Sequence, residues 1–210
     1  MAEASAEAVL RRGLQSLSLP LQAEQQQQLL QFIALVAKWN RKYNLTAISD
    51  PVEMVIKHLL DSLVISPYLH GETLLDVGCG AGLPSLPLAL TQPQRSFTLV
   101  DSNHKKIAFV NEVKRKLALT NVTAIHARVE DLGRAEHHSI ICRAFTALPR
   151  FLDLTAPLLA VDGRWLAMKG ANPQRELSEV SDRYLVDEVV PLTVPELSAE
   201  RHLVVVRHRA

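Results

Sequence analysis

A run of glycines follows a short apolar segment near residue 75. The run 76–82 reads DVGCGAG, and it lies between an expected strand, 73–77, and an expected helix, 83–90. Gly78, Gly80 and Gly82 allow a sharp turn and let a ligand approach the backbone closely, while the N-terminus of the following helix presents free N–H groups. The pattern predicts a nucleotide-binding corner with Asp76 beside it.

A second acid, Asp101, ends the next expected strand, 97–100, about twenty residues after the loop. In a parallel sheet such an acid can accept hydrogen bonds from both ribose hydroxyls, which predicts a nucleoside ligand. Dinucleotide folds favour G-x-G-x-x-G, whereas this loop runs G-x-G-x-G after an acid. The loop suits S-adenosylmethionine better, because that molecule has no pyrophosphate but carries an amino group and a sulfonium. NAD as the ligand, and a glycine turn that merely joins a strand to a helix, stay open as alternatives.

The cysteines and histidines offer no further chemistry. Cys79 has no neighbouring His or Lys in the loop that would lower its pKa, so it is interpreted as a small filler. Cys142 lies between Ile141 and Arg143, and not in the Pro-Cys or Thr-Cys context of a nucleophilic cysteine. The chain has no CxxC, and its eight histidines show no HExxH or similar spacing, so we expect no metal site.

These residues need a parallel sheet to position them, and the pattern after residue 71 predicts one. Short apolar segments alternate with helical ones, which is typical of βα units. Two later segments, separated by a proline-bearing link, predict an antiparallel hairpin and bring the strands to seven. Pro149 and Pro157 predict that the last helix is kinked or shortened. The expected strands are 73–77, 97–100, 123–129, 139–145, 164–168, 184–190 and 202–206, and the expected helices are 83–90, 103–119 and 148–161.

The first 67 residues have a helical pattern that predicts three helices. The third has a clear start, because Asp50 can cap it, Pro51 suits its first position and Glu53 is placed for a capping box. We therefore expect an N-terminal helical extension, residues 1–70, packed on a ligand-binding α/β domain, residues 71–210.

Composition bounds the location and the partners of the chain. Its 210 residues are 48% hydrophobic, enough for one core, and 23 Lys and Arg against 22 acids give a net charge of +1. Any contact with RNA must therefore come from local patches. No stretch approaches the ~18 apolar residues of a membrane span, and the N-terminus inverts the order of a secretory signal. We expect a cytoplasmic monomer that does not contact membranes.

Short motifs follow one another in a fixed order along the whole chain. The N-terminal part carries KWN at 38–40, NLT at 44–46, Glu53-Met54, His58 and Asp61-Ser62. The later part carries the glycine loop, Ser102, Lys105-Lys106, Phe109, RVE at 128–130, RAF at 143–145, Lys169-Gly170 and ERHLVV at 200–205. In this order and distribution, the motifs make the chain resemble the RsmG family, also called GidB.

The resemblance implies a Rossmann-like class I methyltransferase that uses S-adenosylmethionine to methylate N7 of a guanine in the decoding region of bacterial 16S rRNA. Its fold would be α/β, a mostly parallel seven-stranded sheet flanked by helices, with an N-terminal helical extension. Cys79 stands where Ser or Thr is expected, and Ser85 where Gly is usual. The expected cofactor contacts are Asp76, Gly78, Gly80, Gly82, Leu83, Asp101, Ser102, Val129, Glu130 and Arg143.

Guanine N7 carries an in-plane lone pair and no proton, so its methylation needs no general base. The Asn/Asp-Pro-Pro-aromatic motif of exocyclic amine methylation does not follow the fourth strand. We expect catalysis by positioning, through Arg143 and Lys169, with no acid or base. A bidentate grip of Arg143 on O6 and N7 would consume the attacking lone pair. Arg143 is therefore expected to bind O6 alone, the cofactor carboxylate or a phosphate, with a purely structural arginine as the alternative.

Contacts with 16S rRNA are expected from local cations. Lys38, Arg41 and Lys42 surround two aromatic rings, Trp39 and Tyr43, that could stack on bases. The alternative is an amphipathic helix whose Trp39 packs in the core and whose cations face water. The full expected set is Lys38, Arg41, Lys42, Lys105, Lys106, Lys169 and Arg201.

Some roles stay open at this point. His58 and Asp61 are near neighbours on one helix, and they either anchor it to the α/β domain or face the substrate. Two other functions compete with the leading one. A small-molecule methyltransferase would use the N-terminal helices as a lid, and a nucleoside-sensing RNA-binding module would bind the cofactor without turnover.

Overall fold

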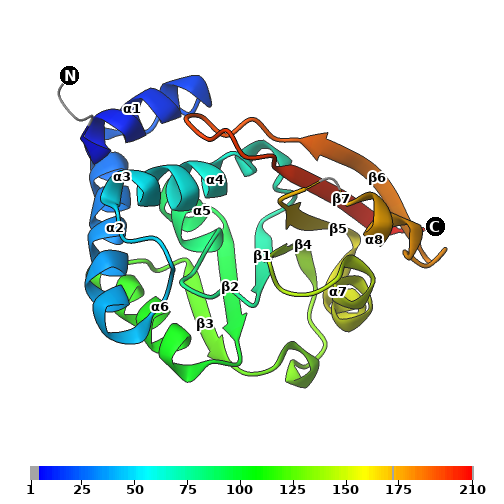
Figure 1. Ribbon diagram of the computed structural model, residues 1–210. Coiled ribbons are helices and arrows are strands. Elements are labelled where there is room, and N and C mark those ends of the chain that lie inside the picture. Colours follow the sequence, from blue (N-terminus) through cyan, green and yellow to red (C-terminus); the bar gives the residue numbers. More distant parts are fainter. Residues whose placement is uncertain (1–4, 172, 210) are drawn as a thin grey trace.

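One twisted sheet of seven strands, in the order β3-β2-β1-β4-β5-β7-β6, forms the centre of the computed structural model, which describes residues 5–171 and 173–209 (Figure 1). The first five strands pair in parallel, and β7 pairs antiparallel with both β5 and β6. The expected mostly parallel seven-stranded sheet is therefore confirmed. The strands are β1 Thr73–Val77, β2 Ser96–Asp101, β3 Val122–His126, β4 His137–Arg143, β5 Leu159–Lys169, β6 Tyr184–Pro191 and β7 His202–His208.

Helices connect most of the parallel strands and cover both faces of the sheet, while a 3-10 turn joins β3 to β4. Side chains alternate between faces along each strand. On β1, for example, Leu74 joins the core under the N-terminal helices and Leu75 joins a second core under α7. The helices that follow β1, β2, β4 and β5 are α5 Ser85–Thr91, α6 His104–Lys116, α7 Leu148–Thr155 and α8 Gln174–Ser178.

Several expected boundaries differ from the structure. Strand 123–129 was predicted too long, because the chain leaves the sheet after His126 and a 3-10 turn, η3 Val129–Asp131, follows. Strand 139–145 ends at Arg143, and β5 begins at Leu159 instead of residue 164. The helix expected at 148–161 is shortened, as Pro149 and Pro157 predicted, by a 3-10 turn, η4 Ala156–Leu158, before β5. Helix α8 has no counterpart among the expected elements.

The three expected N-terminal helices are present beside one face of the sheet (Figure 1). They are α1 Ala6–Ser16, α2 Ala23–Tyr43 and a third helix made of α3 Pro51–Met54, a π-helical turn η1 Val55–Leu60 and α4 Asp61–Leu63. A 3-10 turn, η2 Ser66–Tyr68, follows. Asp50 caps the third helix by accepting from the Glu53 backbone N–H at 2.7 Å. Instead of closing a capping box, the Glu53 side chain pairs with Lys57 at 3.0 Å.

The N-terminal helices share a hydrophobic core with the sheet. Phe32, Leu59 and Leu63 are fully buried, and the Phe32 ring lies 6.3 Å from that of Phe109 on α6. Gly13 on α1 packs so closely on Leu60 that a Cβ there would lie 2.3 Å from a Leu60 methyl group. The third helix lies beside the carboxyl ends of β4 and β5, where its Lys57, His58 and Asp61 line one cavity with residues of those strands. Within residues 5–171 and 173–209, no helix is both long enough and apolar enough to cross a membrane.

Candidate cofactor and substrate site

The glycine loop after β1 is held against the end of β2 by the backbone. The N–H groups of Gly78 and Cys79 both donate to the Val100 carbonyl, at 2.9 and 3.1 Å. Gly78 has a φ of +69°, and a Cβ there would lie 2.6 Å from the Phe145 ring. Because an L side chain rarely adopts this backbone conformation and would also collide with Phe145, only glycine fits without strain.

Asp101, the last residue of β2, faces the same loop. Its Oδ2 accepts from the Gly80 N–H at 2.9 Å and its Oδ1 from the Asn103 N–H at 2.8 Å, while Lys106 Nζ lies 3.6 Å from Oδ2. A carboxylate offers about four lone-pair positions. Two therefore remain for hydroxyl donors of a ligand after the backbone has fixed the orientation of the group.

A cavity of about 410 Å³ opens between the ends of β1, β2 and β4. Of the expected cofactor contacts, Gly78, Asp101, Ser102, Val129 and Glu130 line it together. Asp76, Gly80, Gly82 and Leu83 are not among its lining residues, and Arg143 lines a neighbouring cavity. Four further lining residues belong to motifs noted in the sequence, although none was expected to contact the cofactor: Val77, Lys106, Ala144 and Phe145. Arg128 of the RVE motif also lines the cavity, and sequence reasoning did not single out Val100, Ala127, Thr146, Arg150 and Leu154.

Asp76 lies at the end of β1, beneath the glycine loop, and is buried. In the part of the chain that the structure describes, neither of its carboxylate oxygens has a hydrogen-bond partner. Burial raises the pKa of Asp76 to about 7, and the nearby Ser85 and the charge of Arg143 oppose this rise only in part. The fold thus holds an acid close to its titration point beside the loop, where a cationic or hydrogen-bond-donating ligand group would stabilise the ionised form.

The two thiols are poor nucleophiles. Cys79 and Cys142 are both buried and unpaired with each other. Burial is the main cause that raises the pKa of each thiol well above its usual value. A thiol held in this form does not supply the reactive thiolate, which agrees with the interpretation of Cys79 as a filler.

A second cavity, of about 500 Å³, adjoins the first and shares Ala144, Phe145 and Thr146 with it. Ala144 has a φ of +55°, an uncommon conformation for a residue with a side chain, and such positions cluster at functional sites. The further lining residues come from the third N-terminal helix and the loop before it, from the ends of β4 and β5, and from the residue before β7: Ile48, Lys57, His58, Asp61, Cys142, Arg143, Met168, Lys169, Gly170 and Arg201.

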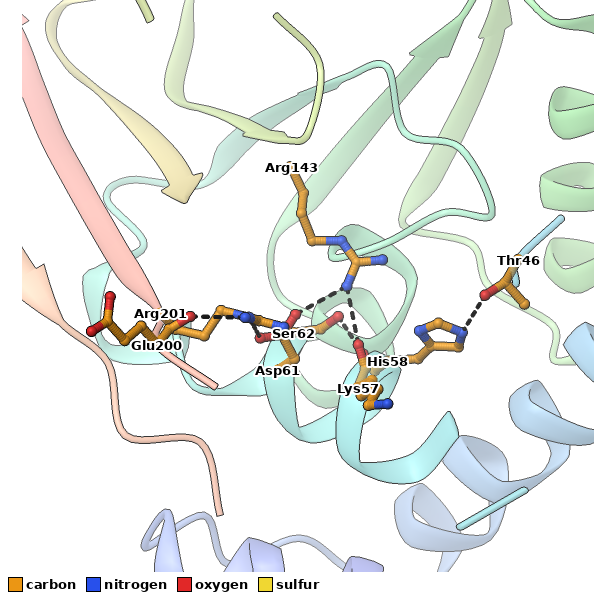
Figure 2. Close-up of polar contacts among 8 residues, drawn as sticks. All are labelled: Thr46, Lys57, His58, Asp61, Ser62, Arg143, Glu200 and Arg201. Atoms are coloured by element: carbon orange, nitrogen blue, oxygen red, sulfur yellow. Dashed lines mark hydrogen bonds and ion pairs between the residues drawn. The ribbon is translucent and has the colours of Figure 1, made fainter. Parts of the chain in front are cut away.

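Asp61 connects the ends of two strands to the third N-terminal helix (Figure 2). Its Oδ2 lies 3.2 Å from Arg143 Nη1, and its Oδ1 lies 2.7 Å from Arg201 Nε. Arg143 Nη1 also donates to the Lys57 carbonyl at 3.3 Å. Asp61 therefore both anchors the helix and lines the second cavity, and Arg201, expected only as an RNA contact, belongs to the same network.

His58 lines the second cavity as a neutral group. Its Nε2 lies 3.1 Å from Thr46 Oγ1, so the NLT and His58 motifs meet in space (Figure 2). Burial, and then the charge of Arg143, lowers the pKa of His58 to about 4. At neutral pH the ring therefore adds no charge to the cavity.

Lys169, at the end of β5, is held by an acid that sequence reasoning missed. Its Nζ lies 2.7 Å from Glu176 Oε2, and the same oxygen accepts from the Leu148 N–H at the start of α7. Glu176 lies on α8, which has only five residues. A helix this short has no periodicity to read, so no local signal could have identified Glu176.

The other expected RNA contacts lie apart from the second cavity. Lys106 lines the first cavity, whereas Lys38, Arg41, Lys42 and Lys105 line neither. The Trp39 ring packs 5.5 Å from Phe109 and 5.1 Å from Tyr43. This packing favours the interpretation of Trp39 as part of the amphipathic face over base stacking.

Metal ligands were not expected. Among the residues described, no group of three or more His, Cys, Asp or Glu side chains is arranged to hold a metal ion.

Comparison with known proteins gives consistent matches over most of the chain. The family GidB, described as rRNA small subunit methyltransferase G, matches residues 25–204. A protein of Alteromonas mediterranea named Ribosomal RNA small subunit methyltransferase G is 45% identical over 197 residues, 93% of each chain. A protein of Pseudomonas aeruginosa with the same name is 44% identical over 203 residues, 96% of this chain and 95% of the relative.

Solved structures share the fold at low sequence identity. The plantazolicin methyltransferase BpumL in complex with SAH superposes with a TM-score of 0.60 at 12% identity, over 87% of this chain and 97% of that chain. M. jannaschii TYW2 in complex with AdoMet superposes with a TM-score of 0.55 at 16% identity, over 72% and 76%. At these identities the likeness concerns the fold alone.

Proposed function

Because this chain belongs to the GidB family, rRNA small subunit methyltransferase G, we propose that it transfers a methyl group from S-adenosylmethionine to N7 of a guanine in 16S rRNA. The observation that carries the proposal is the pair of adjoining cavities. One carries the glycine loop and Asp101, and the other is lined by four cationic side chains, Lys57, Arg143, Lys169 and Arg201.

The residues of the first cavity fit S-adenosylmethionine. Asp101 keeps lone pairs free after its two backbone hydrogen bonds, which suits the ribose hydroxyls. Asp76 does not line the cavity but is buried beneath the adjoining glycine loop, and its oxygens lack partners in the described chain, which suits the amino group of the methionine part. We propose that Val129, Glu130 and Ser102 hold the adenosine, that the loop residues Gly78, Gly80, Gly82 and Leu83 supply close backbone approach, and that Arg143 lies at the methyl end. When bound, the cofactor supplies an electrophilic methyl group on a sulfonium.

The chain contributes positioning and not proton transfer. Guanine N7 has no proton to remove, so the buried thiols and the neutral His58 are not required as bases. Holding the reacting atoms in near-attack geometry can supply roughly 7 to 11 kcal/mol in favourable cases. We propose that the target guanine enters the second cavity, where Arg143 and Lys169 orient it toward the shared residues 144–146.

The RNA around the target is proposed to meet cations both at the cavities and outside them. Lys106 is placed at the first cavity and Arg201 at the second, while Lys38, Arg41, Lys42 and Lys105 would contact more distant phosphates. A net charge of +1 gives little long-range attraction, so structured RNA or subunit context would set the affinity. Action as a monomer in the cytoplasm, where small subunits are found, belongs to the same proposal.

The test maps the modification directly. 16S rRNA from cells with and without the gene is compared for N7-methylguanosine, and subunits from the deletion strain are then incubated with the purified protein and tritium-labelled S-adenosylmethionine. We expect one mark to be lost in the deletion strain and restored in vitro. Retention of every mark would refute the substrate assignment, and label passing to the metabolite pool instead would favour a small-molecule methyltransferase.

A further inference from the structure

Asp61 occupies a position between three parts of the fold. It begins α4, directly after the π-helical turn η1, and its side chain is only 4% exposed. Its two oxygens pair with Arg143 at the end of β4 and with Arg201 immediately before β7, one oxygen for each arginine (Figure 2). One buried carboxylate therefore fixes two guanidinium groups that are far apart in the sequence.

The charges of this network do not balance. Two guanidinium groups face one carboxylate, and within the described chain neither Arg143 nor Arg201 has a second acidic partner within ion-pair distance. The other two cations of the second cavity are paired separately, Lys57 with Glu53 and Lys169 with Glu176. Asp76 also acts on Arg143, but it lies beyond ion-pair distance, and its raised pKa of about 7 leaves it only partly ionised at neutral pH. Part of a positive charge is therefore left over at the cavity wall, which favours an anionic ligand.

Both arginines keep donors for such a ligand. Arg143 uses Nη1 for Asp61 and for the Lys57 carbonyl, and Arg201 uses Nε for Asp61 and Nη1 for the Glu200 carbonyl. Among residues 5–171 and 173–209, Arg143 Nε and Nη2 and Arg201 Nη2 have no hydrogen-bond partner, and each side chain is 24% exposed. The forked geometry of a guanidinium matches a phosphate well.

We propose that Arg143 and Arg201 bind an RNA backbone phosphate next to the target guanosine, and that Asp61 is the positioning residue that orients both for it. The inference rests on the proposed function and names the part of the substrate that the second cavity recognises. Of the three ligands considered for Arg143, which were guanine O6, the cofactor carboxylate and a phosphate, the inference chooses the phosphate. Guanine O6 is neutral and would not balance the surplus charge, and both arginines line the second cavity, not the one assigned to the cofactor.

Asp61 and the arginines should affect different kinetic quantities. Without the Asp61 charge the two guanidinium groups repel each other and lose their shared orientation, but both positive charges remain. Loss of Arg201, in contrast, removes one cation from the RNA interface. Each phosphate contact that is lost changes the slope of log affinity against log salt by about 0.7 to 0.9.

The experiment measures methyl transfer to undermethylated small subunits over a series of salt concentrations. For Arg201→Gln we expect KM for subunits to rise about tenfold, and the salt slope of kcat/KM to fall by about 0.7 to 0.9. Arg201→Lys should keep the slope, because it keeps the charge. Asp61→Asn should lower kcat at least about tenfold at an unchanged slope, with the affinity for S-adenosylhomocysteine within about twofold of wild type.

Asp187→Asn is the matched control, because it breaks another Asp–Arg pair, with Arg207 at 2.8 Å, on strands β6 and β7 away from both cavities. It should leave kcat, KM and slope unchanged. Wild-type kcat in folded Asp61→Asn, or a wild-type slope in Arg201→Gln, would overturn the inference. If Asp61→Asn does not fold, the salt slopes of Arg201→Gln and Arg201→Lys test the inference by themselves. Failure of wild-type protein to methylate subunits would instead refute the proposed function.

Discussion

Replacing Asp101 by alanine removes the carboxylate that we propose accepts the ribose hydroxyls of the cofactor. The change is informative because the Asp101 carboxylate has a fixed orientation, set by the N–H groups of Gly80 and Asn103 at 2.9 and 2.8 Å. Only 7% of the residue is exposed, so water cannot easily take its place.

The magnitude follows from the hydrogen bonds that are lost. A hydrogen bond to a charged acceptor contributes roughly 1.5 to 3 kcal/mol, so the loss of two weakens binding by about 3 to 6 kcal/mol. Since each 1.4 kcal/mol is a factor of ten, the dissociation constant for S-adenosylhomocysteine should rise by roughly two to four orders of magnitude.

Titration calorimetry with S-adenosylhomocysteine measures this change, and thermal unfolding shows whether the variant is folded. Alanine at position 101 also leaves two backbone donors without their acceptor, which could loosen α6. Asn103→Ala is therefore the control, because it removes only the α6 cap, in which Asn103 Oδ1 accepts from the Lys105 N–H at 2.9 Å. Binding of the Asp101 variant within threefold of wild type, or an equal loss in Asn103→Ala, would refute the ribose assignment.

Two further predictions concern stability. In the folded protein the pKa of Asp76 is raised from 3.8 to about 7. Because ionised Asp76 is disfavoured in the fold, its contribution to folding stability falls as the pH rises from about 4 to 7. Asp76→Asn should therefore stabilise the cofactor-free protein more at pH 8 than at pH 4, with a difference in the free energy of unfolding of up to about 4 kcal/mol, and it should weaken cofactor binding. Urea titrations at the two pH values measure the stability effect, and an equal effect at both would contradict the prediction. Ala118, just beyond α6, has a φ of +51°. Ala118→Gly should raise the free energy of unfolding by about 1 kcal/mol, whereas Ala108→Gly inside α6 should lower it by a similar amount, both by thermal unfolding; a destabilised Ala118→Gly would disprove the strain.

The part of the fold that could be predicted from the sequence depends on local periodicity. Short apolar segments located all seven strands, and the prolines at 149 and 157 correctly predicted a shortened α7. The boundaries that were predicted wrongly lie where an apolar pattern in the sequence continues past the end of a strand or helix. The apolar residues after His126 leave the sheet to reach the first cavity, and those at 159–161 extend β5.

The site divides in the same way. The glycine loop and Asp101 could be predicted because each follows directly from one strand, and the structure brings them together at one cavity. The ion pairs of Asp61 could not be predicted, because its partners lie 82 and 140 positions away and meet it only through tertiary packing. Glu176, which holds Lys169, lies on a helix too short to leave a pattern.

A crystal structure of the protein with S-adenosylhomocysteine tests the central claim most directly. We expect the ligand in the cavity between β1 and β2, with its ribose hydroxyls on the Asp101 carboxylate and its sulfur directed toward residues 144–146. Ligand density anywhere else, or a first cavity closed by the side chains around Gly78, would contradict the assignment of this cavity to the methyl donor.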